Sequence, residues 1–306
     1  MRPLLYCFFS ALAFVSSGCS SDSKGSAKAS VETTDAGDSG STPVDTGPQP
    51  KLPAAPADCP TLATGTVNVL GQPVELWVGD KQPGKKGPVL LYWHGTGSTA
   101  DEIKAFMSPM LDEIQAEGGI AASFTTTLGT GTTTGNNVWY TGDYDSADVI
   151  VACAAQQLDV DVKRIYAAGC SAGGLQAGSM VAARSSYLAA AMTNSGGDLL
   201  VSTFDDPTHI PSIITTHGNF DQDFVVVHFS DVSKHTDQVI ADMGGFSVDC
   251  DHGGGHCGAP ADDIAAEWQF VKDHPFGVSV DPYANGLPST FPTYCTKYAA
   301  MPMTSP

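Results

Sequence analysis

One short motif constrains the fold of this chain more than any other feature. Residues 169–173 read Gly-Cys-Ser-Ala-Gly, a G-x-S-x-G pattern centred on Ser171. The preceding residues, 163–168, alternate as a β-strand does, and residues 175–184 are small, apolar and compatible with a helix. A sharp turn between a strand and a helix pushes one serine hydroxyl out of the sheet edge, and the flanking glycines leave room for that turn. The pattern therefore predicts a nucleophilic serine in a domain of mixed α and β structure.

Strand-like and helix-like segments alternate on both sides of the motif. Expected strands are residues 88–93, 120–128, 163–168, 188–193 and 213–216, after a hairpin over 67–78; expected helices are 100–117, 146–158, the segment after Ser171, 231–243 and 264–272. The near-continuous apolar run at 88–93 is typical of a strand covered on both faces. We therefore expect one domain, residues 58–306, with a mostly parallel central sheet and helices on both faces.

The first 57 residues read as targeting and linker segments. The apolar run over 3–15 is too short to span a bilayer and has the length of a signal sequence core. Small residues before Cys19 resemble a bacterial lipobox, although Ser16 stands where that pattern prefers an aliphatic residue. We expect a signal peptide over 1–18 and lipidation at Cys19, with ordinary secretory cleavage nearby as the alternative. Either outcome exports the protein, which is expected on the cell envelope or secreted. Residues 19–57 contain almost no large apolar side chains and predict a disordered linker after the lipid anchor site.

The charge balance limits the possible partners. The formal net charge is -19 at pH 7, which makes nucleic acid an unfavourable partner. No second apolar stretch is long enough to cross a membrane, so membrane contact is expected only through the lipid anchor. We expect a monomer whose partner is its substrate.

A serine nucleophile needs a base to take its proton and a third group to orient that base. Asp221 follows the expected strand 213–216, in a loop where such an acid would lie. His256 follows three glycines just before the last expected helix, on a loop that could carry it to Ser171. Asp223 and His252 are the alternatives for acid and base, respectively. His217 is expected to pack near the acid rather than act as the base.

The negative charge that develops during acyl transfer needs backbone N–H groups as donors. Ala172, directly after the nucleophile, would supply one. Thr96 would supply the other, since His94-Gly95-Thr96-Gly97 follows an early buried strand. Trp139 and Tyr140 lie in a polar loop, where they would either line the substrate pocket or pack against the domain.

Four motifs together resemble the secreted esterases of the polyhydroxybutyrate depolymerase and feruloyl esterase group. They are Trp93-His94-Gly95-Thr96-Gly97, Gly169-Cys170-Ser171-Ala172-Gly173-Gly174, His217-Gly218-x-x-Asp221 and Gly254-Gly255-His256. The resemblance covers roughly residues 60–275. It implies an α/β-hydrolase fold, in which serine, acid and histidine follow one another in this order. It also implies activity on carboxylic esters without a cofactor.

Cysteines flank two of these residues. Cys170 precedes the serine and Cys257 follows the histidine, which is similar to the Cys-Ser, Asp, His-Cys pattern of the tannase and fungal feruloyl esterase family. In that family a disulfide ties the nucleophile to the base. Those enzymes also carry a large lid insertion between serine and acid, whereas the stretch between 171 and 221 is too short for one. We therefore expect no large lid domain and a more open site.

Six cysteines remain after Cys7 in the signal peptide and Cys19, and an even set in an exported protein predicts disulfides. We expect Cys170–Cys257, because the triad must bring these residues together, with Cys59–Cys295 and Cys153–Cys250 as guesses for the rest. Cys250–Cys257 is the main rival pairing. Cys250, His252, His256 and Cys257 also have the ligand types of a zinc site. Thiolates rarely persist outside the cell, and these four lie too close together on one loop for a tetrahedral frame, so no metal is expected.

The sequence thus predicts an exported serine carboxylic-ester hydrolase that acts through an acyl-enzyme. Polyhydroxybutyrate-type oligomers and feruloyl or acetyl esters of polysaccharide are the expected substrates, possibly polymeric. A serine peptidase or acyltransferase on the same fold is one alternative, and a non-catalytic surface binding protein is another.

Overall fold

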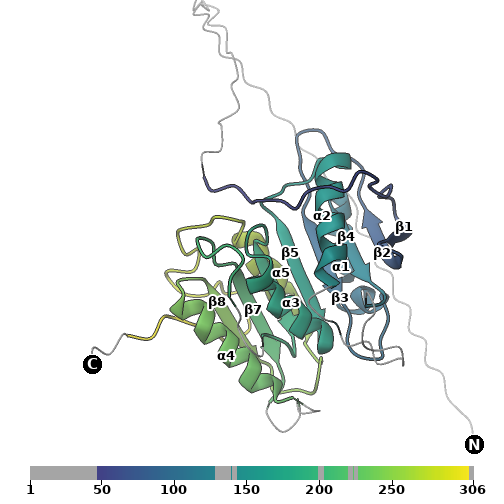
Figure 1. The fold of residues 1–306 in the computed structure, drawn as a ribbon. Helices are drawn as coiled ribbons and strands as arrows, with labels where there is room; N and C mark the ends of the chain where they lie inside the picture. Colours follow the sequence, from purple (N-terminus) through teal and green to yellow (C-terminus); the bar gives the residue numbers. More distant parts are fainter. Residues whose placement is uncertain are drawn as a thin grey trace, which may run out of the picture. The chain divides into compact units, whose positions relative to one another are not determined.

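The computed structural model of the 306-residue chain describes residues 47–127, 139, 143–198, 203–219, 223 and 227–302. A unit that begins at Thr46 contains all of them. Its centre is a nine-stranded sheet in the order β1-β2-β4-β3-β5-β6-β7-β8-β9 (Figure 1). The strands are β1 (Gly65–Val69), β2 (Gln72–Val78), β3 (Val89–Trp93), β4 (Ile120–Phe124), β5 (Ile165–Cys170), β6 (Ala190–Asn194), β7 (Ser212–His217), β8 (Ser247–Asp251) and β9 (Cys295–Lys297).

The six central strands, β4-β3-β5-β6-β7-β8, run parallel, while β1, β2 and β9 are antiparallel to their neighbours. Every residue of β3, β4, β5, β6 and β7 is buried, as expected for strands with helices on both sides. The expected hairpin is formed by β1 and β2, which turn through Leu70 and Gly71, both with positive φ. Parallel strands bring all their carboxyl ends to one edge, and this edge carries the candidate site.

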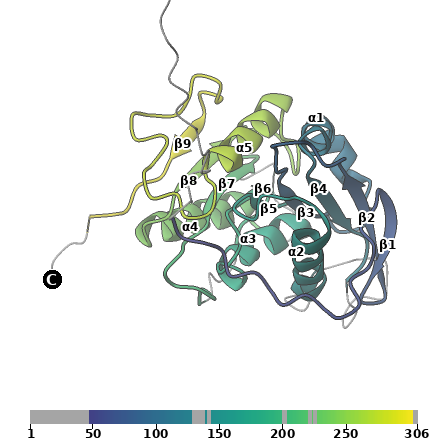
Figure 2. The ribbon, with the colours of Figure 1, turned by 90° about the horizontal axis from the view of Figure 1, so that it is seen from above.

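Five helices cover the two faces of the sheet: α1 (Glu102–Ala116), α2 (Tyr144–Gln157), α3 (Ala172–Ala183), α4 (Phe229–Asp242) and α5 (Ala261–Asp273). Figure 2 shows α1 and α5 on one face and α2, α3 and α4 on the other. Alternate strand residues supply the two cores. Leu90, Tyr92 and Tyr166 pack towards α1 and α5, while Leu91, Trp93 and Ala167 pack towards α2 and α3. None of the helices in the described part is long and apolar enough to cross a membrane.

Two strands and the start of the domain differ from the sequence prediction. Strand β8 was not predicted; it contains Asp249 and Asp251, and Asp249 is buried against His217. Strand β9 lies in the tail, where it pairs with β8. The predicted linker boundary at residue 57 is too late, because Lys51 donates its N–H to Ser186 O and its ammonium lies 2.6 Å from an oxygen of Asp206. A short extended segment can therefore dock through its backbone and one charge although its composition resembles a linker.

Three disulfides join the six expected cysteines, and one of them links Cys170 to Cys257. The other two guessed pairs were wrong: the structure contains Cys59–Cys153 and Cys250–Cys295. Topology explains the difference. Cys250 and Cys295 face each other across the β8–β9 pair, and Cys59 approaches helix α2, which carries Cys153. Sequence spacing carries no information about either contact.

Candidate active site

Ser171 lies at the turn between β5 and α3, with φ 57° and ψ -121°. This strained conformation is the one expected for a nucleophile elbow. The neighbouring glycines are required by close packing, since an added Cβ would lie 1.8 Å from Trp93 O at Gly173 and 2.5 Å from Gly173 at Gly169. The first N–H groups of α3, including that of Ala172, have no acceptor within the helix and surround the serine. This is the position predicted for one oxyanion donor.

His256 is held by an aspartate. Its Nδ1 lies 2.6 Å from Oδ1 of Asp223, and its ring packs 4.8 Å from that of Phe229, the first residue of α4. Gly218 N–H donates to Asp223 Oδ2 at 2.9 Å. With Nδ1–H donated to the carboxylate, Nε2 of His256 is left as the basic nitrogen. The structure therefore joins the predicted histidine to an aspartate, but to Asp223 and not to the favoured Asp221.

The acid in this unit is Asp223, the alternative, whereas the favoured Asp221 lies outside the described residues. The reason is local. Asp223 donates its N–H to Asn219 O, and this turn aims its carboxylate back at Gly218 N–H and at His256. Burial by itself would raise the pKa of Asp223, but hydrogen bonds from His256, a buried serine and Gly218 N–H outweigh it and lower that pKa. Asp223 is therefore ionised at neutral pH.

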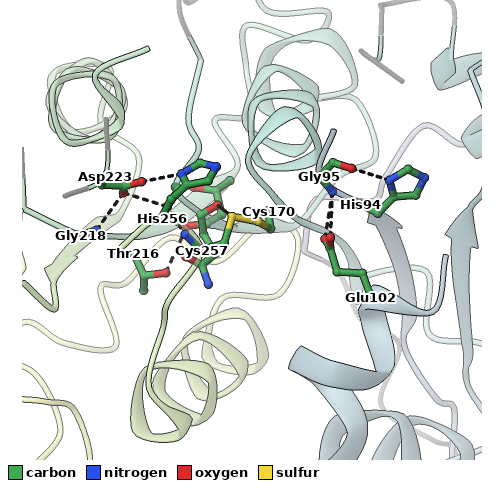
Figure 3. Close-up of a disulfide and its surroundings, with 12 residues drawn as sticks. His94, Gly95, Glu102, Cys170, Thr216, Gly218, Asp223, His256 and Cys257 are labelled. Carbon is green, nitrogen blue, oxygen red and sulfur yellow. Dashed lines mark hydrogen bonds and ion pairs between the residues drawn. A yellow bond between two sulfur atoms is a disulfide. The ribbon is translucent and has the colours of Figure 1, made fainter. Parts of the chain in front are cut away.

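The disulfide brings the two halves of the site together. Cys170 and Cys257 have Cα atoms 5.9 Å apart, which places the adjacent Ser171 and His256 on facing loops. Figure 3 shows this bond between the Asp223–His256 pair and a second hydrogen-bonded group around Gly95. Cys250 and Cys257 each form a disulfide, so neither is available as a thiolate ligand for the zinc site considered as an alternative.

The hydroxyl of Ser171 makes no hydrogen bond within the described part of the chain. The hydrogen bond between Ser171 and His256 that proton transfer requires is therefore not formed in this structure. Such contacts commonly tighten only when substrate is bound. The strained serine, the ordered base and the disulfide are in place without it.

A second arm of the site is built on the loop after β3. Gly95 N–H donates to both carboxylate oxygens of Glu102, at 3.0 and 3.2 Å (Figure 3). Tyr92 OH donates to the same carboxylate at 2.9 Å. An added Cβ at Gly95 would lie 3.4 Å from Ser171 Cβ, so this loop passes beside the serine. Because Gly95 N–H is used by Glu102, the N–H of Thr96 is the next available donor. Among the described residues it has no partner, which fits its predicted role as oxyanion donor.

Trp139 supports the same loop. Its indole N–H donates to His94 O at 2.8 Å, its ring meets the His94 ring at 5.0 Å, and it is only 7% exposed. These contacts are those of a packed residue, the second of the two roles considered for it. Tyr140 lies outside the described residues.

Sequence reasoning missed two groups that order the site, Glu102 and Ser195. Glu102 binds a backbone N–H, a partner that no motif reports. Ser195 follows β6 and is fully buried in a left-handed conformation with φ 46°. The signal that could have found it is its position: it ends a buried parallel strand beside the nucleophile strand, at the sheet edge where sites form.

A buried carboxyl group lies beneath the disulfide. Glu267 of α5 is 3% exposed, lies 2.7 Å from Thr216 Oγ1, and shares a small cavity with Cys170. Burial raises its pKa from 4.5 to about 8, so it is neutral at pH 7. An uncharged carboxyl group can lie in this apolar layer without a counter-ion.

Replacing this group with an amide should change how stability depends on pH. An acid with a raised folded-state pKa binds more protons when folded, so the free energy of unfolding falls as pH rises between 4.5 and about 8. In Glu267→Gln this fall should shrink by ~2–4 kcal/mol, making the variant the more stable protein at pH 9. Urea unfolding at pH 5 and pH 9 measures it; an equal fall in both proteins would show that Glu267 ionises normally.

Removing the central disulfide should impair the site more than the fold. In Cys170→Ala/Cys257→Ala the two loops lose their covalent link, and activity should fall roughly tenfold or more, since small misplacements of reacting groups are costly. Initial rates with and without reductant check this. Cys250→Ala/Cys295→Ala is the matched control, because it removes a disulfide between β8 and β9 and should retain activity. Equal activities in both double variants would contradict the positioning role.

Comparisons with known proteins support the fold. No family model matches the chain, and no curated protein matches its sequence. Among solved structures, native pOPH matches with a TM-score of 0.60 at 16% identity, covering 82% of this chain and 97% of that one. Native sOPH matches with a TM-score of 0.56 at 15% identity, covering 80% and 96%. The Bacillus cereus carboxylesterase matches at 0.50 and 14%, covering 66% and 93%.

At these identities the similarity concerns the fold alone. Together with the strand order it confirms the predicted class: an α/β-hydrolase fold, with a mostly parallel sheet and helices on both faces. The chain from Ser171 to Asp223 is taken up by α3, β6 and β7, so no large lid domain is inserted there.

Proposed function

We propose that this chain is a serine hydrolase of carboxylic esters. The observation that carries the proposal is the Asp223–His256 pair, with 2.6 Å between oxygen and nitrogen, tethered by Cys170–Cys257 beside a serine in a strained elbow. An orienting acid, a base and a nucleophile together form the arrangement that activates a serine for acyl transfer. A binding protein would have no need of this combination.

The proposed reaction has two halves. Ser171 Oγ attacks the ester carbonyl while His256 Nε2 takes its proton, and the N–H groups of Thr96 and Ala172 stabilise the tetrahedral oxyanion. His256 then gives the proton to the departing alcohol, which leaves an acyl-enzyme. Water, deprotonated by His256, hydrolyses that ester and restores the serine. Asp223 remains ionised throughout and stabilises the imidazolium, and no cofactor takes part.

The substrate class follows from the sequence resemblance and remains part of the proposal: hydroxybutyrate-type oligomers, or feruloyl or acetyl esters of polysaccharide. The absence of a lid domain between nucleophile and acid favours large substrates. A pOPH variant similar in fold, with a TM-score of 0.62, is known in complex with pNPB, which makes that compound a suitable first substrate.

A substrate panel tests the proposed function. The disulfide-bonded protein would be assayed with pNPB, hydroxybutyrate oligomers, a feruloyl ester and an acetylated polysaccharide, alongside peptide substrates. Hydrolysis of at least one ester and of no peptide is expected. Peptide cleavage without ester cleavage would overturn the assignment, as would inactivity towards every substrate.

We also propose that the protein is exported and anchored by lipid at Cys19, which lies outside the described residues. Three disulfides support the first part, since such bonds persist in oxidising compartments. Incorporation of a fatty-acid label that is lost in Cys19→Ala would support the second, and an unlabelled wild-type protein would refute it.

A further inference from the structure

Ser195 is the residue that connects the acid to the loop of the base. Its hydroxyl oxygen lies 2.8 Å from Asp223 Oδ2 and 2.9 Å from the backbone nitrogen of Cys257, the residue after His256. Ser195 therefore bonds to the side chain of the proposed acid and to the backbone of the loop that carries the proposed base. One buried hydroxyl therefore spans two segments more than 30 residues apart in sequence.

The chemistry of the partners fixes the direction of both hydrogen bonds. A backbone N–H can only donate and an ionised carboxylate can only accept. The hydroxyl must therefore accept from Cys257 and donate to Asp223. Since Gly218 N–H also donates to Oδ2, that oxygen is saturated and Oδ1 is left for His256. The proton of Ser195 thus selects which carboxylate oxygen binds the imidazole.

Backbone strain points to the same residues. Four described residues other than glycine have positive φ: Leu70, Ser171, Ser195 and Cys257. Leu70 lies in a hairpin turn, whereas the other three meet at the site. Such conformations cost about 1–3 kcal/mol each and persist where surrounding contacts over-determine them. Ser195 and Cys257 are strained at the two ends of one hydrogen bond, and Ser195 is itself anchored by its N–H to Thr216 O at 2.7 Å.

We infer that Ser195 is a positioning residue of the candidate triad, whose hydroxyl holds Asp223 and the His256 loop in the reactive arrangement. This inference rests on the proposed function for its kinetic consequence. Its structural content, one hydroxyl that orders the acid–base pair, does not depend on the substrate. The hydroxyl of Ser195 bonds to Asp223 and to the backbone of Cys257, and therefore acts through the acid and the loop of the base.

Two variants separate positioning from folding. Ser195→Ala removes the hydroxyl and keeps the strained φ, while Ser195→Gly removes it and relieves that strain, since glycine adopts positive φ freely. If Ser195 served only the fold, the folded glycine variant would have a kcat close to that of wild type. We expect both variants to lose activity similarly, by roughly 10- to 100-fold, as supporting hydrogen-bond partners of a site commonly do. The loss should fall on kcat, with KM little changed.

Ser185→Ala is the matched control. Like Ser195, Ser185 is fully buried and accepts a backbone N–H, from Asp206 at 2.6 Å. Its hydroxyl donates to a backbone carbonyl, Asp206 O at 3.2 Å, where that of Ser195 donates to a carboxylate. It precedes β6, whereas Ser195 follows it, so it lies at the opposite end of the strand from the site. Its replacement should lower stability as much and leave kcat/KM unchanged.

An NMR signal provides a readout that a purely structural role would not move. Asp223 receives a hydrogen bond from His256 Nδ1–H, at 2.6 Å, and another from the Ser195 hydroxyl, at 2.8 Å. A carboxylate that loses one donor binds its remaining donors with a different strength. The resonance of the His256 Nδ1–H proton, assigned with His256→Gln and recorded at one pH for every protein, should therefore move in both Ser195 variants.

The outcomes are distinct. Reduced kcat together with a moved His256 Nδ1–H resonance, in both Ser195 variants but not in Ser185→Ala, is the expected result. Wild-type kcat and an unmoved resonance in folded Ser195→Gly would overturn the inference. A wild-type protein inactive on all esters would refute the proposed function, yet the resonance would still decide whether Ser195 orders the Asp223–His256 pair.

Discussion

Ser171→Ala is expected to lose essentially all ester turnover, by about 10⁵-fold or more in kcat, while remaining folded. Removing the nucleophile of a serine triad eliminates the acyl-enzyme route and leaves only the contributions of binding and the oxyanion donors. The fold should tolerate the change because the Ser171 hydroxyl makes no hydrogen bond in the described structure. Initial rates on the best ester, with urea unfolding alongside, measure both effects.

The matched control is Ser98→Ala. Ser98 lies in the loop after β3, where its N–H bonds to Gly95 O, and its side chain is exposed. This loss of a hydroxyl near the site should change kcat less than about threefold. If Ser171→Ala retained even a tenth of wild-type activity, another residue would have to be the nucleophile and the triad would be rejected.

Asp223→Asn should have the second largest effect, a fall in kcat of about 10³- to 10⁴-fold. The amide keeps the size of the side chain but removes the charge that stabilises the imidazolium. In the wild type, His256 Nδ1 lies 2.6 Å from a carboxylate oxygen of Asp223. The amide can instead offer an N–H to Nδ1, which favours the tautomer with its proton on Nε2, the nitrogen that must act as the base. Since the pKa of Asp223 is lowered, the aspartate contributes its charge at neutral pH, and wild-type activity should fall when acid protonates Asp223.

Asp221→Asn tests the alternative acid directly. The two aspartates are two residues apart; Asp223 bonds to His256, and Asp221 lies outside the described residues. Activity of Asp221→Asn within a few-fold of wild type is therefore expected at pH 7. The reverse ranking, with Asp221→Asn inactive and Asp223→Asn active, would reassign the acid.

Much of the fold was predictable because burial leaves a pattern in the sequence. Strands β3 and β5 were recognised as apolar or alternating runs, and the elbow as glycines around a serine between a strand and a helix. Each of these signals is local, as is the hairpin turn between β1 and β2. The mostly parallel sheet with helices on both faces followed from the alternation of strands and helices.

The rest depended on contacts between distant residues. Strand β8 contains Asp249, whose burial makes sense only beside His217 of β7, at 2.7 Å. Asp221 and Asp223 differ by two residues in a loop, and no periodicity distinguishes them. Two disulfide pairs were set by neighbours across β8–β9 and by the approach of Cys59 to α2. Glu102 and Ser195 bind backbone groups, whose positions exist only in the folded chain.

Covalent labelling tests the central claim, an activated serine at residue 171, most directly. The disulfide-bonded domain would be treated with a fluorophosphonate, and intact mass would be recorded for wild type beside Ser171→Ala. One adduct per wild-type chain, mapped to Ser171 and absent from the variant, is the predicted result. Unlabelled wild-type protein with its three disulfides intact, or equal labelling of both proteins, would contradict the proposed serine hydrolase.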